Sequence, residues 1–193
     1  MLVSKEICKS LSDQAIIRKA LVEVDYFSCL FERYENQLLR YIKNLAPVSH
    51  DEAEDILQDA FINIWKHLNE YDEQLSCSSW MYRIVHNQAV SAIRKRKSYG
   101  KDKVVAVESS GINDMPEEDG PPNDDKSAHI REILDLLPLM YKEVLALKYL
   151  ENMSYEDISD ILKIPDGTVA TRINRAKKAF AAIAADRHLL DND

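Results

Sequence analysis

Three stretches in the first half of the chain carry apolar side chains every three or four residues, which is the spacing of a helix with one buried face. The first begins at Phe27 and stops before Pro47, which cannot continue a helix. The second follows Ser49 and Glu52, which are spaced as a capping box, where each side chain bonds the other residue's backbone N–H. The third begins near Ser78. These patterns predict a block of three helices.

The sequence of the second half predicts four shorter helices, the first ending before Pro138 and the second beginning after it. A capping box formed by Ser154 and Asp157 starts the third, the Pro-Asp-Gly segment 165–167 ends it, and Asp166 can cap the fourth. The fourth helix has an apolar stripe formed by Val169, Ile173, Ala176 and Phe180. Two short helices joined by so tight a turn are typical of a helix-turn-helix unit, whose second helix enters the major groove of DNA.

The polar face of this last helix is strongly basic, since residues 172–178 include four cations and no acid. Arginine side chains reach guanine edges and phosphates, and threonine or asparagine side chains reach bases or the DNA backbone. A basic face is also expected where an ordinary helical hairpin simply exposes its polar side to solvent. The caps, the turn and the one-sided charge together favour a DNA-binding helix.

Composition divides the chain into five parts. Residues 99–126 hold three of the four glycines and three of the six prolines, with few apolar side chains, which predicts a flexible acidic linker. The linker separates two helical domains, 25–98 and 127–186. Residues 1–24 are weakly amphipathic and predict a short helical arm, and residues 187–193 form a tail.

The net charge of the 193 residues is −8, which argues against a protein that coats nucleic acid indiscriminately. The charges are segregated, however. Residues 83–97 contain five lysines and arginines and no acid, whereas residues 104–125 contain seven acids and no lysine or arginine. A basic surface on an acidic protein can still bind DNA, and the acidic remainder suits a protein that reaches DNA while a partner holds it.

Cys8, Cys29 and Cys77 are odd in number and lack CxxC spacing, so neither a disulfide framework nor a zinc site is expected, and Cys29 falls on an apolar face typical of a core. The chain shows no secretory leader and no apolar stretch long enough to span a bilayer, which predicts a cytoplasmic protein without membrane insertion. It shows no nucleophile–base set, phosphate-binding loop or metal-ligand spacing, so neither an enzyme nor a cofactor is expected.

Three segments together are more specific than a helix-turn-helix alone: DILQDAFINIWKHL (55–68), SSWMYRIVHNQAVSAIRKRK (78–97) and LPLMYKEVLALKYLENMSYEDISDILKIPDGTVATRINRAKKAF (137–180). In sequence and order they resemble bacterial RNA polymerase sigma factors of the extracytoplasmic-function (ECF) group. The resemblance implies an all-α fold with two small helical domains joined by the linker. These are sigma region 2, with three or four helices, and sigma region 4, with four helices including the helix-turn-helix. It also implies a subunit that binds core RNA polymerase, recognises a −35 promoter element as duplex and melts a −10 element.

The resemblance assigns residues to each task. The clamp helices of the largest polymerase subunit would bind the polar face of Asp55, Gln58, Asp59 and Asn63. The −10 element would be opened and read by Ser78, Ser79, Tyr82, Arg83, Asn87, Arg94, Arg96 and Lys97. The −35 element would be bound by Lys148, Thr168, Thr171, Arg172, Asn174, Arg175 and Lys178.

Several of these positions have a second interpretation. Tyr82 and Trp80 are candidates for stacking on an extruded base, but Trp80 begins the apolar stripe of its helix and suits a core at least as well. Leu145 and Leu150 suit either the core or docking on the flap of the second-largest polymerase subunit. Ala170 stands where the family often has arginine or lysine, so the −35 preference is expected to differ from that of more basic relatives.

The resemblance further implies three partners: core polymerase, promoter DNA and an anti-sigma factor that silences the free chain. One alternative is a stand-alone helix-turn-helix regulator that binds an operator without polymerase, although the sequence shows no dimerisation seam. Another is a sigma-like adaptor that has lost promoter opening, against which the intact segment around Asn87 counts.

Overall fold

The computed structural model describes residues 3–98 and 125–190, and every regular element within these ranges is helical. The predicted linker lies outside the described residues except for its last two positions, and so does the end of the predicted tail. Within these ranges, no helix is both long and apolar enough to cross a membrane.

Three long helices form the N-terminal half, as the apolar spacing predicts: α3 (Phe27–Leu45), α4 (His50–Lys66) and α5 (Cys77–Ser98). The capping box of Ser49 and Glu52 is formed at the start of α4. A short 3-10 turn, Val24–Tyr26, precedes α3, and another, Leu68–Glu70, follows α4. The three long helices pack on one another around a shared apolar core.

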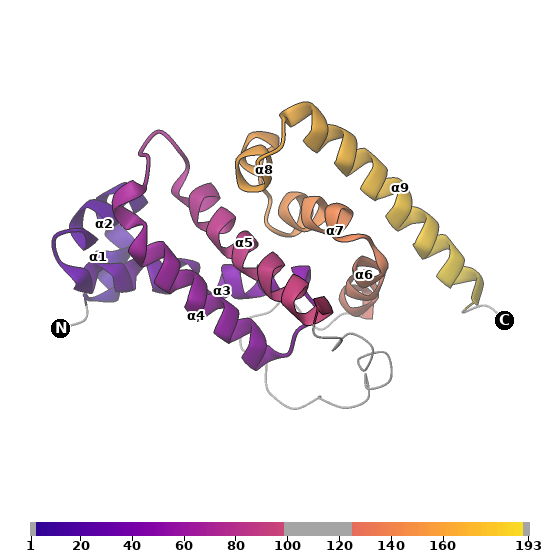
Figure 1. Cartoon of the computed structure of the whole chain (residues 1–193), viewed down its shortest axis with the longest axis horizontal. Coiled ribbons are helices and arrows are strands. Elements are labelled where there is room, and N and C mark those ends of the chain that lie inside the picture. Colours follow the sequence, from indigo (N-terminus) through magenta and orange to yellow (C-terminus); the bar gives the residue numbers. More distant parts are fainter. Residues whose placement is uncertain (1–2, 99–124, 191–193) are drawn as a thin grey trace.

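The predicted arm folds as two short helices, α1 (Lys5–Ser10) and α2 (Asp13–Ala20), which pack against α3 (Figure 1). Ile16, Ile17 and Ala20 of α2 are buried in the same core as the long helices. The first residues of the chain therefore extend the N-terminal core in this structure.

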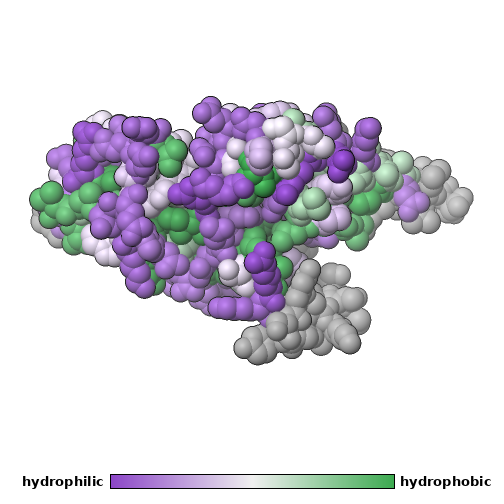
Figure 2. All heavy atoms as spheres, turned by 45° about the horizontal axis from the view of Figure 1, so that its top comes forward, coloured by the Kyte–Doolittle hydropathy of each residue, from purple (hydrophilic) through white to green (hydrophobic). Residues whose placement is uncertain are grey.

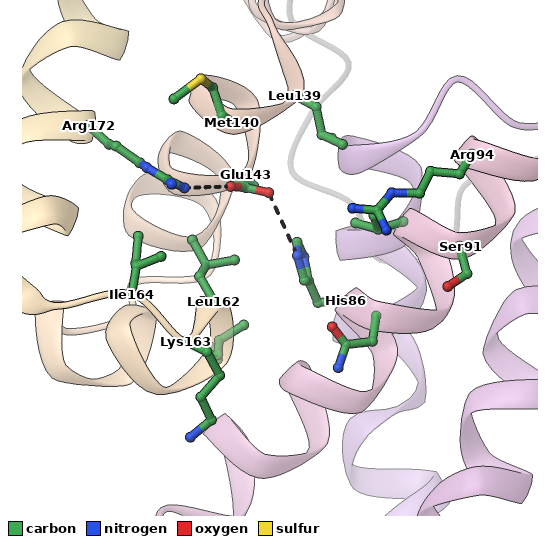
Figure 3. A pocket seen from close by; sticks show the side chains of 13 residues that line it. His86, Ser91, Arg94, Leu139, Met140, Glu143, Leu162, Lys163, Ile164 and Arg172 are labelled. Carbon is green, nitrogen blue, oxygen red and sulfur yellow. Dashed lines mark hydrogen bonds and ion pairs between the residues drawn. The ribbon is translucent and has the colours of Figure 1, made fainter. Parts of the chain in front are cut away.

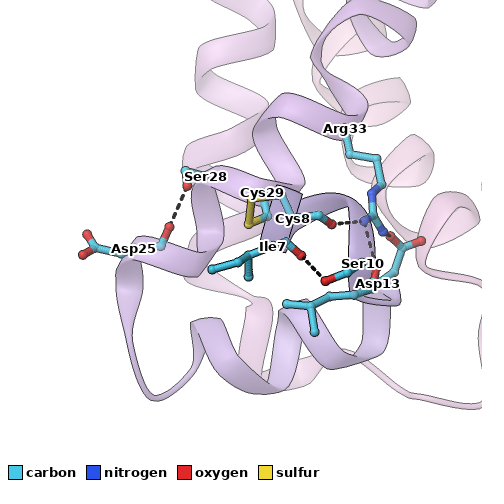
Figure 4. Close-up of a disulfide and its surroundings, with 9 residues drawn as sticks. Ile7, Cys8, Ser10, Asp13, Asp25, Ser28, Cys29 and Arg33 are labelled. Carbon is cyan, nitrogen blue, oxygen red and sulfur yellow. Dashed lines mark hydrogen bonds and ion pairs between the residues drawn. A yellow bond between two sulfur atoms is a disulfide. The ribbon is translucent and has the colours of Figure 1, made fainter. Parts of the chain in front are cut away.

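The expectation of no disulfide is wrong, because Cys8 and Cys29 form one that joins α1 to α3 (Figure 4). Arg33 reinforces the junction, since its Nη2 donates to the carbonyl oxygen of Cys8 at 2.6 Å and its Nη1 pairs with Asp13. The two cysteines meet only once the helices pack, so their spacing in the sequence does not reveal the pair. Cys77 is free and buried, and burial raises the pKa of its thiol to about 12.

The C-terminal half has four helices, as predicted: α6 (Asp125–Leu136), α7 (Leu139–Leu145), α8 (Tyr155–Leu162) and α9 (Asp166–Leu190). A π-helical segment, Ala146–Leu150, prolongs α7. The capping box of Ser154 and Asp157 is formed at the start of α8, which ends at the left-handed Lys163. Asp166 is the first residue of α9 rather than its cap, because the carbonyl of Pro165 already accepts the backbone N–H of Thr168.

The two halves pack against each other through α5, which lies between the N-terminal helices and α8 (Figure 1). Helix α3 also contacts α7 and the π-helical segment, and α9 runs along the outer side of α7. The face seen in Figure 2 is mainly hydrophilic, with smaller hydrophobic areas, among them the end of the molecule formed by α1 and α2. Leu21, Val22 and Val24 are exposed at that end.

Candidate nucleic-acid interface

The basic side of α9 is exposed above a buried apolar side. Val169, Ile173 and Ala176 are buried, and α9 packs mainly on α7 and α8. Thr168 is half-buried in the first turn. One exposed stripe continues from it at helical spacing, and its members are Thr171, Asn174, Arg175 and Lys178. These hydrogen-bonding and cationic groups form one continuous exposed surface on α9.

Two other predicted −35 residues are engaged within the protein. Arg172 is half-buried, and its Nη1 donates to Oε1 of Glu143 at 3.1 Å. Nζ of Lys148 donates to the carbonyl oxygen of Met153 at 3.1 Å and lies 5.2 Å from the centroid of the Tyr155 ring. In this arrangement, acceptors of the protein itself hold both cations.

Two predicted −10 residues of α5 are buried against the C-terminal half. Oγ of Ser79 donates to Oδ1 of Asp157 at 2.6 Å, and the hydroxyl of Tyr82 donates to Oε2 of Glu151 at 2.7 Å. Ser79 is 2% and Tyr82 1% exposed. The Tyr82 ring packs against Tyr41, with the centroids 5.2 Å apart. The side chain expected to stack on an extruded base is therefore covered in this structure.

The core interpretation holds for Trp80 and Leu145. Trp80 is buried, and its ring centroid lies 5.3 Å from that of Tyr71. Leu145 is buried within the C-terminal half, whereas Leu150 is half-buried. Neither Trp80 nor Leu145 offers a surface to a partner here.

The remaining predicted −10 residues of α5 differ in their surroundings. Those exposed or half-buried along α5 are Ser78, Arg83, Asn87 and Arg94. Arg96 turns back to α4, because its Nη1 donates to the carbonyl oxygen of Pro47 at 2.8 Å and lies 3.2 Å from Oε2 of Glu52. Lys97 belongs to α5, but its side chain lies outside the described residues.

His86, which no sequence pattern singled out, joins α5 to the C-terminal half (Figure 3). Its Nδ1 lies 2.9 Å from the Tyr41 hydroxyl, and its Nε2 lies 3.7 Å from Oε2 of Glu143. Burial, with a smaller effect of Arg94, lowers the pKa of His86 to about 4, so the imidazole is neutral at neutral pH. Burial also raises the pKa of Glu143, and the positive charge of Arg172 offsets part of this rise. One line of polar contacts thus links α5, α7 and α9.

A cavity of about 660 Å³ opens beside these contacts (Figure 3). Its wall includes His86 and Glu143, apolar side chains of the C-terminal half, and cations from α5 and α9. The apolar members are Val90, Leu139, Met140, Ile161, Leu162 and Ile164, and the cationic members are Arg94, Lys163 and Arg172. No group of three or more His, Cys, Asp or Glu side chains is arranged for a metal ion in the part of the chain that the structure describes.

The predicted polymerase-binding residues lie on one side of α4. Asp55, Gln58 and Asp59 are exposed, and Asn63 is half-buried, with its Nδ2 donating to Oε1 of Gln88 at 3.4 Å. Ile62 belongs to the same face, outside the apolar stripe of α4, and is 52% exposed. This face therefore combines hydrogen-bonding groups with one exposed apolar side chain.

Trp65 continues the helical spacing of the buried residues of α4 but is only partly covered. Its ring contacts Phe27, with the centroids 5.2 Å apart, yet 39% of the residue is exposed at the end of α4. The apolar stripe predicted for this helix therefore reaches the surface at its C-terminal end.

Two family models match the chain in order. Sigma-70 region 2 matches residues 30–99, and Sigma-70, region 4 matches residues 128–180. The chain is 32% identical over 183 residues to the ECF RNA polymerase sigma factor SigW of Bacillus subtilis, covering 86% of this chain and 96% of that protein. It is 27% identical over 181 residues to the ECF RNA polymerase sigma-E factor of Escherichia coli K12, covering 89% of this chain and 94% of that protein.

Two solved structures share the fold. CnrH in complex with the cytosolic domain of CnrY superposes with a TM-score of 0.67 at 21% identity, covering 94% of this chain and 98% of CnrH. The sigma factor RpoE in complex with the anti-sigma factor NepR from Bartonella quintana superposes with a TM-score of 0.65 at 24% identity. The match covers 82% of this chain and 96% of RpoE.

Proposed function

Because this chain belongs to the ECF group of RNA polymerase sigma factors, we propose that it binds core polymerase through α4, opens and reads the −10 element through α5, and binds the −35 duplex through α9. The proposed domains are 25–98 for the first two tasks and 127–186 for the third, with 1–24 as an arm, 99–126 as a linker and 187–193 as a tail. The residues assigned above to each task remain part of this proposal.

The observation that carries the proposal is the exposed stripe of Thr171, Asn174, Arg175 and Lys178 on α9. It stands opposite a buried apolar face, on the second helix of a helix-turn-helix unit with a formed capping box. A helix presented in this way has the donors and charges that major-groove edges and phosphates accept. A stand-alone regulator would share this stripe, but it would not need the polar face of α4 or a sigma region 2.

The proposed partners are core polymerase, promoter DNA and an anti-sigma factor. The similar structures of CnrH and RpoE contain CnrY and the anti-sigma factor NepR, respectively, which supports a protein inhibitor for this chain as well. The chain would supply no catalytic groups of its own, because core polymerase performs RNA synthesis, and it would act in the cytoplasm, where polymerase and DNA are found.

Run-off transcription with purified bacterial core polymerase and a library of genomic fragments tests this function directly. We expect defined transcripts that appear only when this chain is added. Operator binding that needs no polymerase, with transcript start sites left unchanged, would instead identify the stand-alone regulator.

Asn87→Ala is expected to reduce promoter opening about tenfold, because an exposed amide can pair with the edge of an extruded base and that contact is worth about 1–3 kcal/mol. Permanganate footprinting of holoenzyme on promoter DNA measures the melted bases, and gel shift with −35 duplex should show no change. Asn36→Ala, at an exposed asparagine of α3, is the matched control. Normal melting by Asn87→Ala would remove this residue from the −10 site.

A further inference from the structure

The N-terminal arm holds a loop that lies at the start of α5. This loop, residues 71–76, connects the 3-10 turn after α4 to α5, at the end of the molecule that α1 and α2 form (Figure 1). Arg18 of α2 makes a bidentate ion pair with Glu73 of the loop: its Nε donates to Oε1 at 2.7 Å and its Nη2 pairs with Oε2. Nε2 of Gln14 donates to the carbonyl oxygen of Glu73 at 3.0 Å. Gln14 and Arg18 stand four residues apart, so one face of α2 binds both the side chain and the backbone of Glu73.

The 71–76 loop leads directly into residues that the proposed function gives to the −10 element. Oγ of Ser76, at the end of the loop, accepts the backbone N–H of Ser79 at 3.4 Å, and its carbonyl oxygen accepts that of Trp80 at 3.0 Å. Ser78 lies between them and is half-buried. The place of the loop therefore also fixes the first turn of α5.

The middle of the loop is exposed, whereas its ends are joined. The hydroxyl of Tyr71 donates to the carbonyl oxygen of Leu75 at 2.7 Å, and the Tyr71 ring packs against α5. Asp72, Glu73 and Gln74 are exposed between these ends, with Oδ1 of Asp72 accepting the N–H of Gln74 at 2.9 Å. The bonds from α2 to Glu73 thus attach the exposed middle of the loop to a second helix.

The arm can support the loop because the arm itself is firmly attached to α3. The hydroxyl of Tyr34 donates to Oδ2 of Asp13 at 2.6 Å, and Arg33 pairs with the same carboxylate. The disulfide of Cys8 and Cys29 ties α1 to α3, and the apolar side of α2 is buried. A contact from a helix held in this way can keep a loop in one place.

The ion pair between arm and loop is exposed, so its loss should act locally. The side chain of Arg18 is 65% exposed and that of Glu73 46%, and water screens such a pair, which leaves it a small part in overall stability. The hydrogen bonds of Arg18 lower the pKa of Glu73, so the carboxylate stays charged at neutral pH. Without the pair, the helices stay folded and the middle of the loop is released. A loop that must be ordered during binding costs affinity, and a loosely held one fits more than one base.

We propose that Gln14 and Arg18 are positioning residues for the −10 site: by holding Glu73, they keep the 71–76 loop where it and the first turn of α5 receive an extruded base. The arm thereby helps to set which −10 sequence is selected, without a DNA contact of its own. This inference rests on the proposed function, because it concerns the same −10 element. It predicts that breaking the contact lowers discrimination between −10 sequences and spares the −35 element.

The test is a double-mutant cycle in the full chain, with Arg18→Gln, Glu73→Gln and both together, each assembled with core polymerase. Fluorescence anisotropy compares a labelled single-stranded oligonucleotide, carrying the −10 sequence upstream of the run-off start sites, with a scrambled one. The ratio of the two affinities is the readout, because a general change of charge affects both oligonucleotides alike. Lys9→Gln and Glu6→Gln are the matched controls, since they make the same charge changes at exposed positions of α1.

Each single variant is expected to lower the ratio about threefold, and the double variant no further, with the controls and the −35 duplex affinity unchanged. Gln14→Ala should shift the ratio in the same direction. In the free chain, the amides of Gln74 and Leu75 bond to Asp72 within the loop, and their hydrogen exchange should be faster in both single variants. The melting temperature should stay the same.

An unchanged ratio in both single variants, or unchanged exchange in the loop, would overturn the inference. A loss in Arg18→Gln alone, or losses that multiply in the double variant, would also overturn it, because Arg18 would then act on DNA directly rather than through Glu73. Run-off transcription by the wild-type chain judges the proposed function separately. Normal transcripts with a failed cycle reject only the positioning role, whereas the absence of transcripts rejects both.

Discussion

Arg175→Ala is expected to weaken binding of a −35 duplex by about 1–3 kcal/mol, or roughly 5- to 150-fold, while the affinity for core polymerase is unchanged. Arg175 is exposed in the middle of the α9 stripe, between Thr171 and Lys178, where a guanidinium can reach both a guanine edge and a phosphate. Fluorescence anisotropy of holoenzyme on duplex DNA, measured over a range of salt concentrations, gives both the affinity and the number of phosphate contacts.

Lys177→Ala is the matched control, because Lys177 is an exposed cation of the same helix that lies outside the stripe, at its edge beside Asn174. It should change duplex affinity much less than Arg175→Ala does. Equal losses from the two variants would indicate a general electrostatic effect, and an equal loss of core affinity would show that the face of α9 has been misassigned.

Asp55→Ala combined with Gln58→Ala is expected to weaken binding of core polymerase by about 2 kcal/mol, or roughly thirtyfold, with little effect on the melting temperature. Both side chains are exposed on α4, so their removal leaves the core packed, whereas a polymerase surface would lose an acceptor and a hydrogen-bonding amide. Competition binding to purified core polymerase measures the affinity, and circular dichroism measures the melting temperature.

Glu32→Ala with Asn36→Ala makes the equivalent change on α3, where an exposed acid and an exposed amide stand four residues apart. This control should bind core polymerase normally. Wild-type affinity in the α4 variant would place the docking surface elsewhere, whereas equal losses in both variants would point to net charge rather than to a defined face.

The helices of this fold could be predicted because their signals are local. Ser49 with Glu52, and Ser154 with Asp157, form the capping boxes that their spacing indicates. The exposed stripe of α9 is also local, because residues three and four apart share one side of a helix whatever lies around it.

The contacts between the halves could not be predicted in the same way. The local sequence around Ser79 and Tyr82 gives no sign that they are buried. Their acceptors lie 78 and 69 residues further along the chain, so the contacts form only when the two halves pack. Nothing in the sequence distinguishes an arginine that stays exposed, such as Arg175, from Arg172, which meets Glu143 only after α7 and α9 pack. The pairing of Cys8 with Cys29 is hidden for the same reason.

The two oxygens of Asp157 have separate tasks. Oδ2 accepts the backbone N–H of Ser154 and completes the cap of α8, whereas Oδ1 accepts the hydroxyl of Ser79 from the other half. Burial alone would raise the pKa of Asp157, but hydrogen bonds from the Ser154 side chain, the Ser79 side chain and the Ser154 backbone hold it below its usual value. Loss of the Ser79 bond leaves every bond of the cap in place. The N-terminal cap of α8 is thus self-contained, and the helix-turn-helix unit does not depend on Ser79 for the start of its first helix.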